Sequence, residues 1–363
     1  MPETMRGVYL TRHGGPEALE WREDIPLPRP GPGQVLVRVL AAGVNNTDIN
    51  TRIGWYAAEI TGATAETAQE VEAGGWGGAL DFPRIQGGDL CGEVVATGPG
   101  AERFAIGRRV TCPINQPRPT EENPVGFVAL GSEYDGAFAE YCLLEERDLY
   151  DVTDAPLSNV EIAAIPCAFG TAAGLLHRAG VTARDEVLIT GASGSVGLAA
   201  VQLARGMGAR VTGVCAASKA ALVQDAGAAE TIDRGTPLPV DRYHAVIDVV
   251  AGDVWPALIE ALRPGGHYAV AGAIAGPVIE ADLRRIYLRD VTIHGCTYQA
   301  PEVFARLVEM VNAGDVRPLV SATYPLRDIG RAQADFQSKA LTGKLVLLPG
   351  DEADATGAGE AKT

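Results

Sequence analysis

The segment from Val187 to Cys215 constrains the fold of this 363-residue chain more than any other part of its sequence. A short apolar run, typical of a buried strand, leads into the glycine-rich turn GASGSVG. The turn opens a helix-like run, and a second strand-like run, RVTGVC, follows. Within the turn, Ala192 takes the first glycine position of the pattern GxGxxG, and Gly194 and Gly197 take the other two. A glycine pattern in this strand–turn–helix context predicts a dinucleotide-binding βαβ unit.

The physical reason for this prediction lies at the start of the helix. Its first N–H groups have no partner within the helix, and the helix dipole adds a partial positive charge, so a pyrophosphate binds there. Gly194 lets the backbone approach the phosphates, and Gly197 lets the helix pack closely on the sheet. A purely structural turn is the alternative. We expect the cofactor to contact Ala192, Ser193, Gly194, Ser195 and Val196.

The second strand of this unit ends without the acidic residue that usually holds the adenosine ribose of NAD. Cys215 stands at that position, and Ser218 and Lys219 follow it. An acid there repels a 2′-phosphate, whereas a hydroxyl and an ammonium group attract one. A charge-assisted hydrogen bond of this kind is worth roughly 1.5–3 kcal/mol. We therefore expect NADP(H) rather than NAD(H). The alternative is that Lys219 simply begins an exposed helix and contacts no cofactor.

Composition limits the classes of protein to which the chain belongs. A length of 363 residues fits two domains, and a formal net charge of −16 argues against nucleic acid or an anionic membrane as a partner. No apolar run reaches the ~18 residues that span a bilayer, and the N-terminus shows no export segment. The six cysteines are scattered without a CxxC pair, which is typical of thiols in a reducing compartment. We expect a soluble cytoplasmic protein.

The pattern of apolar residues changes along the chain. Short alternating strands dominate residues 1–155, whereas helix and strand patterns alternate through residues 156–299, with the near-continuous apolar strands of a covered parallel sheet. Residues 300–349 add a helix and a closing strand. We expect an α/β protein in which a β-rich domain, 1–155 with 300–349, is interrupted by a nucleotide-binding domain, 156–299. The small, acidic residues 350–363 predict a disordered tail.

Motifs spread over nearly the whole chain carry a family resemblance: GVNNTDINTRIGWY, GGDLCGEVVATGPG, DGAFAEY, PCAFGTAAGLL, GASGSVG and TGKLVLLP. Together they resemble the medium-chain dehydrogenase/reductase superfamily, and its zinc-independent branch of quinone oxidoreductases and enoyl reductases looks closest. The resemblance implies a GroES-like β-rich catalytic domain and a Rossmann domain with a doubly wound parallel sheet. These motifs are specific for the superfamily and much less specific for a substrate.

The zinc-dependent alcohol dehydrogenases of that superfamily bind catalytic zinc through a cysteine, a His-Glu pair and a second cysteine. This chain has Asn45 at the first position, Gly88 and Asp89 at the pair, and Cys167 at the last. One thiolate and one carboxylate cannot form the three-ligand site that catalytic zinc needs. The cluster of four cysteines that binds structural zinc is also missing. We therefore expect no metal, and we expect Cys167 to be a small buried residue.

A site without metal favours a conjugated acceptor over a simple ketone, because the new charge delocalises onto oxygen and hydrogen bonds suffice to hold it. The resemblance to enoyl reductases makes Tyr56 the candidate proton donor, with a packed aromatic side chain as the alternative. It places Asn45 near the nicotinamide or the substrate oxygen, unless Asn45 is only a turn residue. Thr47 stands where zinc alcohol dehydrogenases keep a proton-relay hydroxyl.

The same resemblance implies further contacts with the cofactor. Thr171 would contact the nicotinamide ribose, and Lys339 would reach the 2′-phosphate. Backbone atoms after two late strands would border the carboxamide, at Gly272, Ala273 and Cys296.

The run Val291–Tyr298 matches the strand by which family members pair sheets across a two-fold axis. An uncovered apolar edge strand is an aggregation hazard, so we expect a homodimer. The leading hypothesis is a zinc-independent NADPH-dependent oxidoreductase that transfers hydride to a quinone or an α,β-unsaturated carbonyl compound. Two alternatives remain: an alcohol dehydrogenase acting on a small alcohol or aldehyde, and a protein that senses NADPH without turnover.

Overall fold

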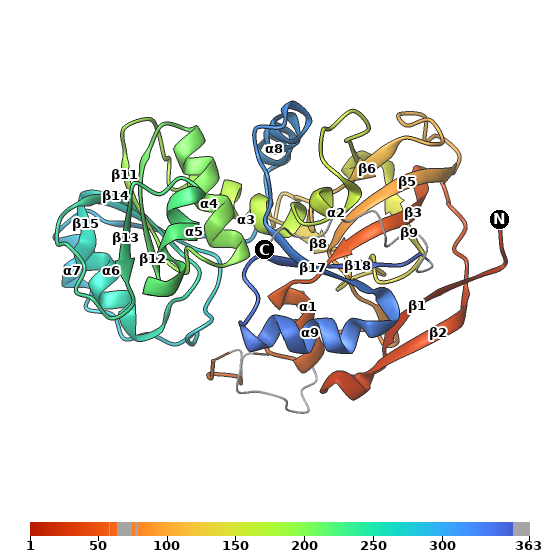
Figure 1. Ribbon diagram of the computed structural model, residues 1–363, viewed down its shortest axis with the longest axis horizontal. Coiled ribbons are helices and arrows are strands. Elements are labelled where there is room, and N and C mark those ends of the chain that lie inside the picture. The colour runs from red at the N-terminus through yellow and green to blue at the C-terminus, as the bar shows by residue number, and fades with distance from the viewer. Residues whose placement is uncertain (58, 64–74, 77–78, 351–363) are drawn as a thin grey trace. The chain divides into compact units, whose positions relative to one another are not determined.

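The computed structural model of this protein describes residues 1–57, 59–63, 75–76 and 79–350 (Figure 1). These described residues form two compact units. Unit 1 contains residues 1–57, 75–76, 79–167 and 308–350, and unit 2 contains residues 59–63 and 168–307.

Two of the boundaries between the units fall inside helices, α3 (Pro166–Arg178) and α8 (Pro301–Ala313). The domain boundaries expected at 155/156 and 299/300 stay a prediction. Of the predicted tail, residues 351–363 lie outside the described residues.

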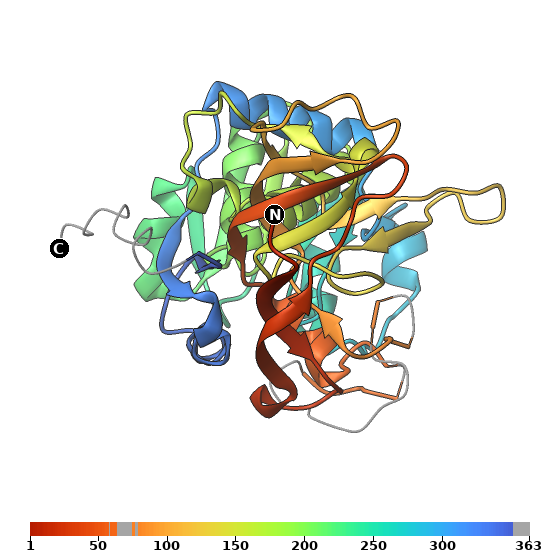
Figure 2. The ribbon, with the colours of Figure 1, turned by 90° about the vertical axis from the view of Figure 1, so that its right-hand side faces the viewer.

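The main sheet of unit 1 has β3 and β5 side by side (Figures 1 and 2). Its strand order is β10-β6-β5-β3-β18-β17, and β9 also pairs with β3. Alternation in the β3 sequence VLVRVL directs Val35, Val37 and Val39 into the core of this unit, while Arg38 is exposed. The strands are β3 (Gln34–Gly43), β5 (Asp89–Thr97), β6 (Arg109–Thr111), β9 (Tyr141–Glu145), β10 (Tyr150–Asp151), β17 (Val320–Pro325) and β18 (Lys344–Leu348).

Smaller elements complete unit 1. The strands β2, β1 and β4 form a further sheet in that order, and β7 pairs with β8. The elements are β1 (Thr4–Leu10), β2 (Leu19–Pro26), β4 (Arg84–Ile85), β7 (Asn115–Pro117), β8 (Phe127–Ala129), α1 (Asn46–Ile53), α2 (Asn159–Ile162) and α9 (Ile329–Ser338).

Unit 2 is built on a parallel sheet with strand order β13-β12-β11-β14-β15-β16. Numbered within this unit, the order is 3-2-1-4-5-6, which is the doubly wound arrangement of dinucleotide-binding domains. The expected α/β class is thereby confirmed. Its strands are β11 (Glu186–Ile189), β12 (Arg210–Cys215), β13 (Glu230–Asp233), β14 (Tyr243–Asp248), β15 (Leu262–Val270) and β16 (Thr292–Gly295). Its helices include α4 (Ser195–Gly206), α5 (Ala220–Asp225), α6 (Trp255–Ala261) and α7 (Arg284–Tyr287).

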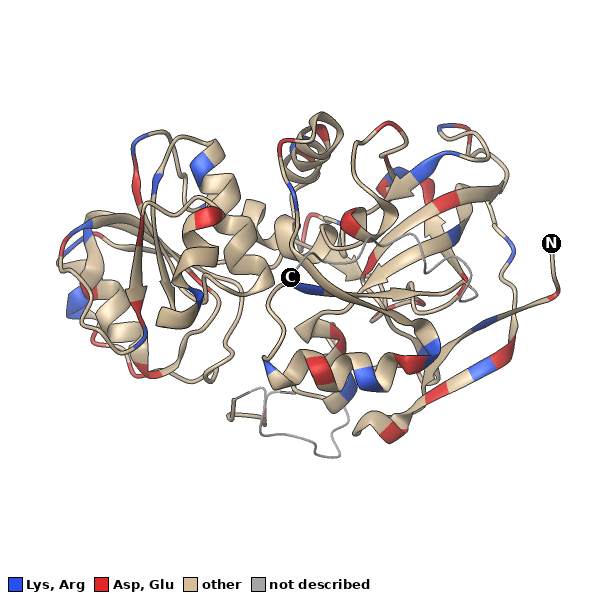
Figure 3. Ribbon diagram, viewed as in Figure 1, with Lys and Arg blue, Asp and Glu red and all other residues tan. Residues whose placement is uncertain are grey.

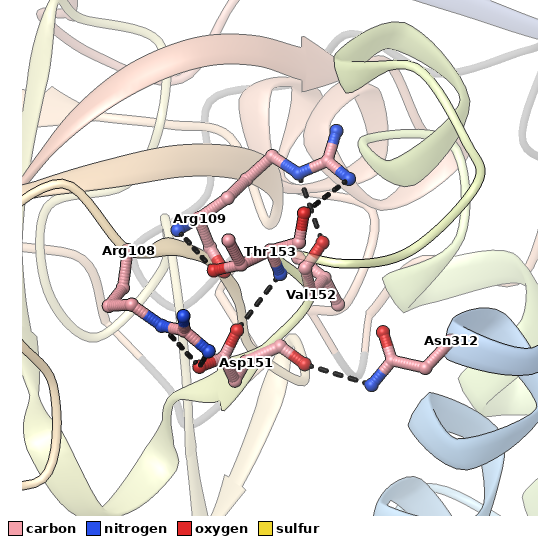
Figure 4. A network of polar contacts seen from close by, with 6 residues as sticks. All are labelled: Arg108, Arg109, Asp151, Val152, Thr153 and Asn312. Carbon is pink, nitrogen blue, oxygen red and sulfur yellow. Dashed lines mark hydrogen bonds and ion pairs between the residues drawn. The ribbon is translucent and has the colours of Figure 1, made fainter.

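Arg109 makes hydrogen bonds to residues 152–157, the segment that connects the unit 1 sheet to α2 and α3. Its guanidinium donates to main-chain carbonyl oxygens between residues 152 and 157, at 2.8–3.0 Å. The neighbouring Arg108 pairs with the carboxylate of Asp151, and Asn312 of α8 donates to the carbonyl oxygen of Asp151 at 3.1 Å (Figure 4). These contacts fix the approach to α3, where Cys167 lies.

Charged residues of both signs are mixed along the ribbon (Figure 3). Many form ion pairs at the surface, such as Arg22 with Asp24, and pairs of this exposed kind contribute about 0–1 kcal/mol each. Within the part of the chain that the structure describes, every helix is too short or too polar to cross a membrane.

Candidate functional site

The predicted glycine turn joins β11 to α4 in unit 2, where the strand order reverses between β11 and β14. Gly191 has a φ of +55°, a left-handed conformation that favours glycine. A Cβ atom on Gly197 would lie 2.2 Å from the carbonyl oxygen of Gly191, so a larger residue would push α4 away from the turn. The backbone geometry therefore explains why Gly191 and Gly197 are glycines without reference to a ligand. The same geometry directs the N-terminus of α4 toward the turn.

The alanine at the first glycine position has its own structural basis. Ala192 is fully buried, and a Cβ atom on Gly213 of β12 would lie 2.9 Å from the Ala192 methyl group. Ser193 is buried as well, whereas Gly194 is exposed and the first two residues of α4 are half-buried. A Cβ atom on Gly194 would meet one neighbouring atom within 4 Å, the Gly191 carbonyl oxygen at 3.3 Å. An exposed backbone at the start of a helix fits the pyrophosphate of a dinucleotide.

At the end of β12, the structure brings the predicted adenosine-site residues together. Cys215 is buried, and burial raises the pKa of its thiol, so it stays neutral. Ser218 is exposed and Lys219 is half-buried, both in the 3-10 helix η3 (Ala217–Lys219).

Two charged residues at this place were missed by the sequence reasoning. Asp233, which ends β13, accepts a hydrogen bond from the backbone N–H of Ala217 at 2.8 Å. The backbone N–H of Arg234 donates to the carbonyl oxygen of Cys215 at 3.2 Å. Since neighbouring parallel strands end at one edge, the predicted βαβα pattern contained the signal: residues that follow the third strand lie beside those that follow the second.

The predicted nicotinamide-side residues of unit 2 follow the last two strands. Gly272 and Ala273 come after β15, and a Cβ atom on Gly272 would lie 3.1 Å from the carbonyl oxygen of Val249. Cys296 comes after β16 and donates its backbone N–H to Val270 at 2.9 Å. Thr171 is half-buried on α3.

Gln299 is a further buried polar residue of unit 2 that the sequence reasoning did not single out. Its side chain packs on α3, where a Cβ atom on Gly170 would lie 2.8 Å from its Nε2. Its Oε1 is buried and has no hydrogen-bond partner among the described residues. Lys339 belongs to unit 1: it ends α9 with a φ of +59°, and its Nζ lies 5.3 Å from the ring centre of Phe336. Its predicted contact with the 2′-phosphate stays a prediction.

Three side chains from distant parts of the sequence form a closed triangle of polar contacts inside unit 1. Nζ of Lys344 lies 2.7 Å from Oδ2 of Asp89 and donates to Oδ1 of Asn45. Nδ2 of Asn45 in turn donates to Oδ2 of Asp89 at 3.1 Å. The side chains of Lys344 and Asp89 are 2% and 0% exposed, so the pair is removed from water. We call Asn45, Asp89 and Lys344 the buried triad.

The sheet explains why these residues meet. Asn45 follows β3, Asp89 begins β5 and Lys344 begins β18, and both β5 and β18 pair with β3 near Gly43. A Cβ atom on Gly43 would lie 2.8 Å from both Asp89 Oδ2 and Lys344 Cε, so the glycine makes room for the pair. Burial by itself lowers the pKa of Lys344, but the carboxylate of Asp89, with smaller contributions from Cys167 and Asp48, more than offsets this and leaves the pKa above its ordinary value. Lys344 is therefore charged at neutral pH.

Cys167 and Thr47 lie beside the triad. Oδ1 of Asp89 accepts a hydrogen bond from the backbone N–H of Cys167 at 2.6 Å, and the Cys167 sulfur lies 4.0 Å from Oγ1 of Thr47. Burial, followed by the charge of Asp89, raises the pKa of the Cys167 thiol to about 12. Cys167 is thus a buried neutral thiol, as expected for a residue that serves packing.

Tyr56 is connected to the same region through its hydroxyl group. Burial raises the pKa of Tyr56 well above its ordinary value, and hydrogen bonds with the side chains of Trp76, Asn50 and Thr47 oppose the rise only in part. The hydroxyl of Tyr56 therefore keeps its proton at physiological pH. Two of the three predicted catalytic side chains, Tyr56 and Thr47, share one hydroxyl network.

The ring of Tyr56 packs among other aromatic rings. Its centre lies 5.4 Å from that of Trp55 and 5.7 Å from that of Trp76, both edge-to-face. Trp76 packs in the same manner on Phe127, at 6.2 Å. Trp76 and Phe127 were not predicted as site residues, because nothing in the local pattern of either segment points to the other.

Asp48, on the first turn of α1, is a second buried carboxyl group near the triad. Its Oδ2 accepts the backbone N–H of Asn45 at 2.8 Å. Burial raises the pKa of Asp48 from 3.8 to about 7, the charge of Asp89 adds to the rise, and the backbone hydrogen bond from Asn45 and the charge of Lys344 oppose it. At neutral pH this group is divided between its two protonation states.

The donor set does not fit catalytic zinc. Of the four positions that bind the metal in zinc-dependent relatives, Asn45 offers an amide oxygen that faces an ammonium group, and Gly88 offers no side chain. Asp89 is paired with Lys344, and Cys167 is the one thiol among these four positions. Catalytic zinc needs three protein ligands from Cys, His, Asp or Glu side chains. Among the described residues, no group of three or more His, Cys, Asp and Glu side chains is arranged to hold a metal ion.

Two family models match the chain: the alcohol dehydrogenase GroES-like domain over residues 31–154 and the zinc-binding dehydrogenase domain over residues 195–313. The chain belongs to the medium-chain dehydrogenase/reductase superfamily. Both the family resemblance and the expected GroES-like and Rossmann architecture are thereby confirmed.

Relatives of this superfamily protein match it almost from end to end. Human quinone oxidoreductase is 28% identical over 95% of this chain and 98% of its own length. Acryloyl-coenzyme A reductase of Metallosphaera sedula is 26% identical over 94% and 99%. A solved structure from Sinorhizobium meliloti 1021, named provisionally as an alcohol dehydrogenase, is 37% identical with a TM-score of 0.85, and the match covers 96% of this chain and 98% of that one. The protein is therefore an oxidoreductase of a family that uses a nicotinamide cofactor.

Proposed function

We propose that this protein is a zinc-independent, NADPH-dependent oxidoreductase that transfers hydride to a quinone or an α,β-unsaturated carbonyl compound. One observation carries the proposal: Asp89, at one of the positions that the family resemblance assigns to the metal site of zinc-dependent members, is paired with the buried ammonium group of Lys344. A site without a Lewis acid favours an acceptor that delocalises the new negative charge. Similarity to a quinone oxidoreductase and to an acryloyl-coenzyme A reductase supports these two acceptor classes.

We assign the cofactor to unit 2. The start of α4 would hold the pyrophosphate through the turn at Gly194, and Ser218 with Lys219 would hold the 2′-phosphate of NADPH. Arg234 adds a second positive charge at that edge, and the Asp233 carboxylate, which accepts the Ala217 N–H, adds a negative charge that these cations must outweigh. When bound, NADPH supplies the hydride.

We assign the hydrogen-bond donors to unit 1. Hydride addition leaves negative charge on the acceptor, and a protonated hydroxyl stabilises that charge where it collects on oxygen. The raised pKa of Tyr56 keeps its proton on Oη, so Tyr56 would donate a hydrogen bond to a hydroquinone anion and a proton to the more basic carbon of an enolate. Thr47 shares the hydroxyl network of Tyr56 and would help to pass a proton from solvent back to the tyrosinate oxygen.

Asn45 has a more limited part in this proposal. An amide group has two N–H donors, and one of those on Asn45 is directed at Asp89. We propose that the other is directed at the nicotinamide or at the substrate oxygen. The same pair of contacts holds the amide in one orientation, because exchange of its N and O atoms would place a donor against the Lys344 ammonium.

We also propose a homodimer in the cytoplasm. β16 is the last strand in the order of the described unit 2 sheet. Large exposed apolar residues gather in the segment around it: Ile274, Val278, Ile279, Leu283, Tyr287, Leu288 and Ile293. Pairing with a second copy would cover both the strand edge and these side chains, and sedimentation velocity would reveal it. All six cysteines lie in the described residues as free thiols, which suits a reducing compartment.

An alcohol dehydrogenase is the second candidate function. The position of the Thr47 hydroxyl, 4.0 Å from the Cys167 sulfur, favours it, because a hydroxyl there would serve as a proton relay for an alcohol. This function would require either direct carbonyl chemistry without a metal or a metal that displaces Lys344.

A screen of NADPH oxidation separates the candidates. Protein purified without chelator is offered quinones, 2-alkenals, cyclic enones, enoyl-coenzyme A esters and simple aldehydes, with NADPH and NADH in parallel. Turnover with quinones or enones supports the proposal, and turnover confined to simple aldehydes supports the second candidate. NADPH binding without any turnover would leave a sensor of the cofactor.

A further inference from the structure

We infer that Lys344 is a positioning residue for this reaction: its buried ammonium group holds the Asn45 carboxamide and the Asp89 carboxylate, and through them it sets the starts of α1 and α3. The kinetic part of this inference rests on the proposed function. Its structural part does not.

The contacts form a continuous path from the end of the chain to the proposed donors. Lys344, at the first position of β18, binds Asp89 and Asn45. Asn45 immediately precedes α1, the helix that carries Thr47. Asp89 binds the backbone N–H of Cys167 at 2.6 Å, on the first turn of α3. One ammonium group therefore ties together the two helices from which Thr47 and Cys167 approach each other.

Stability alone does not account for a lysine at this depth. Removing both members of an ion pair from water is costly, and apolar residues of similar volume often serve a core as well or better. The exposed fractions of 2% and 0% place Lys344 and Asp89 in this costly class. Position 43 must also be glycine, because a Cβ atom there would collide with the side chains of both Asp89 and Lys344.

The geometry instead suits orientation of the groups around the ammonium. A buried charge accepts few arrangements of its partners, because each unpaired donor or acceptor is penalised in a low-dielectric interior. Lys344 directs the oxygen of Asn45 toward itself and so turns the amide nitrogen toward Asp89. It supplies the positive charge that a metal ion supplies at the corresponding positions of zinc-dependent relatives, but as a fixed part of the chain.

The kinetic test compares Lys344→Met and Lys344→Ala with the unaltered enzyme. We expect kcat to fall about a hundredfold, a loss that a misplacement near 1 Å can cause. The dissociation constant for NADPH should change less than twofold, because the glycine turn lies in unit 2. A matched control is Arg118→Met, which breaks another ion pair of unit 1, with N···O of 2.6 Å and side chains 21% and 6% exposed. It should lower the melting temperature and leave kcat within twofold.

Chemical rescue tests whether the ammonium group itself is required. Ethylammonium or methylammonium should restore the kcat of Lys344→Ala at least tenfold, whereas equal concentrations of tetramethylammonium or sodium should not, because neither donates hydrogen bonds. Equal effects of all these cations would overturn the inference.

A double variant keeps the inference testable if Lys344→Met fails to fold. Asp89→Asn combined with Lys344→Met removes both charges, and the new amide oxygen can still accept the Cys167 N–H. We expect this variant to fold and to remain slow. Recovery of the full kcat in the double variant would mean that the lysine only compensates Asp89, and the inference would be wrong.

A readout that needs no turnover separates this inference from the proposed function. The side-chain amide signals of Asn45, assigned by their loss in Asn45→Asp, should shift in the NMR spectrum of Lys344→Ala and return with ethylammonium. Unshifted signals would refute the positioning role. If none of the acceptors tested supports NADPH oxidation by the unaltered protein, the proposed function fails. The amide signals would still decide the role of Lys344.

Discussion

The pH dependence of stability offers a quantitative test of the buried polar region, through Asp48→Asn. In the folded state the pKa of Asp48 is raised from 3.8 to about 7, chiefly by burial. As the pH rises above 4, the unfolded chain releases this proton first, so the folded state loses stability until the pH passes about 7. The full loss is about 4 kcal/mol, of which about 2.5 kcal/mol falls between pH 5 and pH 8.

An asparagine at this position cannot ionise, and its oxygen can still accept the N–H of Asn45. The free energy of unfolding of Asp48→Asn, minus that of the unaltered protein, should therefore rise by about 2.5 kcal/mol from pH 5 to pH 8. Urea unfolding at closely spaced pH values measures this difference, and contributions from titrating groups that do not interact with Asp48 cancel in it.

Asp151→Asn is the control for this experiment. Burial raises the pKa of Asp151, but hydrogen bonds from Thr153 and Arg108 outweigh burial and leave the pKa below its ordinary value. Stability due to Asp151 is therefore present above pH 4 and lost only at more acid pH, so its difference curve should be flat from pH 5 to pH 8. A flat curve for Asp48→Asn as well would refute the assigned burial and electrostatics of Asp48.

Three further substitutions test the assigned roles. Lys219→Ala should raise the KM for NADPH about ten- to a hundredfold and leave that for NADH nearly unchanged, because it removes a charge-assisted hydrogen bond to the 2′-phosphate; steady-state kinetics with both cofactors measures this. Tyr56→Phe should lower kcat about a hundredfold without changing the dissociation constant for NADPH, measured by fluorescence titration. Gly197→Ala should weaken NADPH and NADH alike at least tenfold in the same titration, because the added Cβ would lie 2.2 Å from the Gly191 carbonyl oxygen.

Each of these predictions has an outcome that contradicts it. Equal losses for both cofactors in Lys219→Ala would remove the lysine from the phosphate site. An unchanged kcat in Tyr56→Phe would leave that residue a packing role among its aromatic neighbours. Normal binding by Gly197→Ala would show that the turn does not hold the pyrophosphate.

The sequence contained most of the fold because the decisive signals are local. The glycine turn, the helix that follows it and the apolar strands of unit 2 each lie within a few residues, and the observed strand order follows from their alternation. The family resemblance also predicted, from sequence alone, that Asn45, Asp89 and Cys167 lie together. In the structure the Asp89 carboxylate accepts hydrogen bonds from Asn45 Nδ2 at 3.1 Å and from the backbone N–H of Cys167 at 2.6 Å.

What the sequence did not reveal depends on pairing between distant segments. Lys344 lies in the motif TGKLVLLP, which carries no local sign of the residue that Lys344 will meet. Only the pairing of β18 with β3 brings it to Asp89. Arg234 was missed for a related reason, since its approach to Cys215 requires β13 to lie beside β12. Local patterns describe an element, and they do not identify the partner that it will meet.

The central claim is that hydride transfer by this protein needs no metal. Its most direct test is elemental analysis of the purified protein combined with the rate of NADPH oxidation by a quinone and by an enone, before and after exhaustive chelation. The account predicts less than a tenth of a zinc ion per chain and the same rate after chelation. A stoichiometric metal bound by Asp89 and Cys167, with turnover that disappears when the metal is removed, would contradict it.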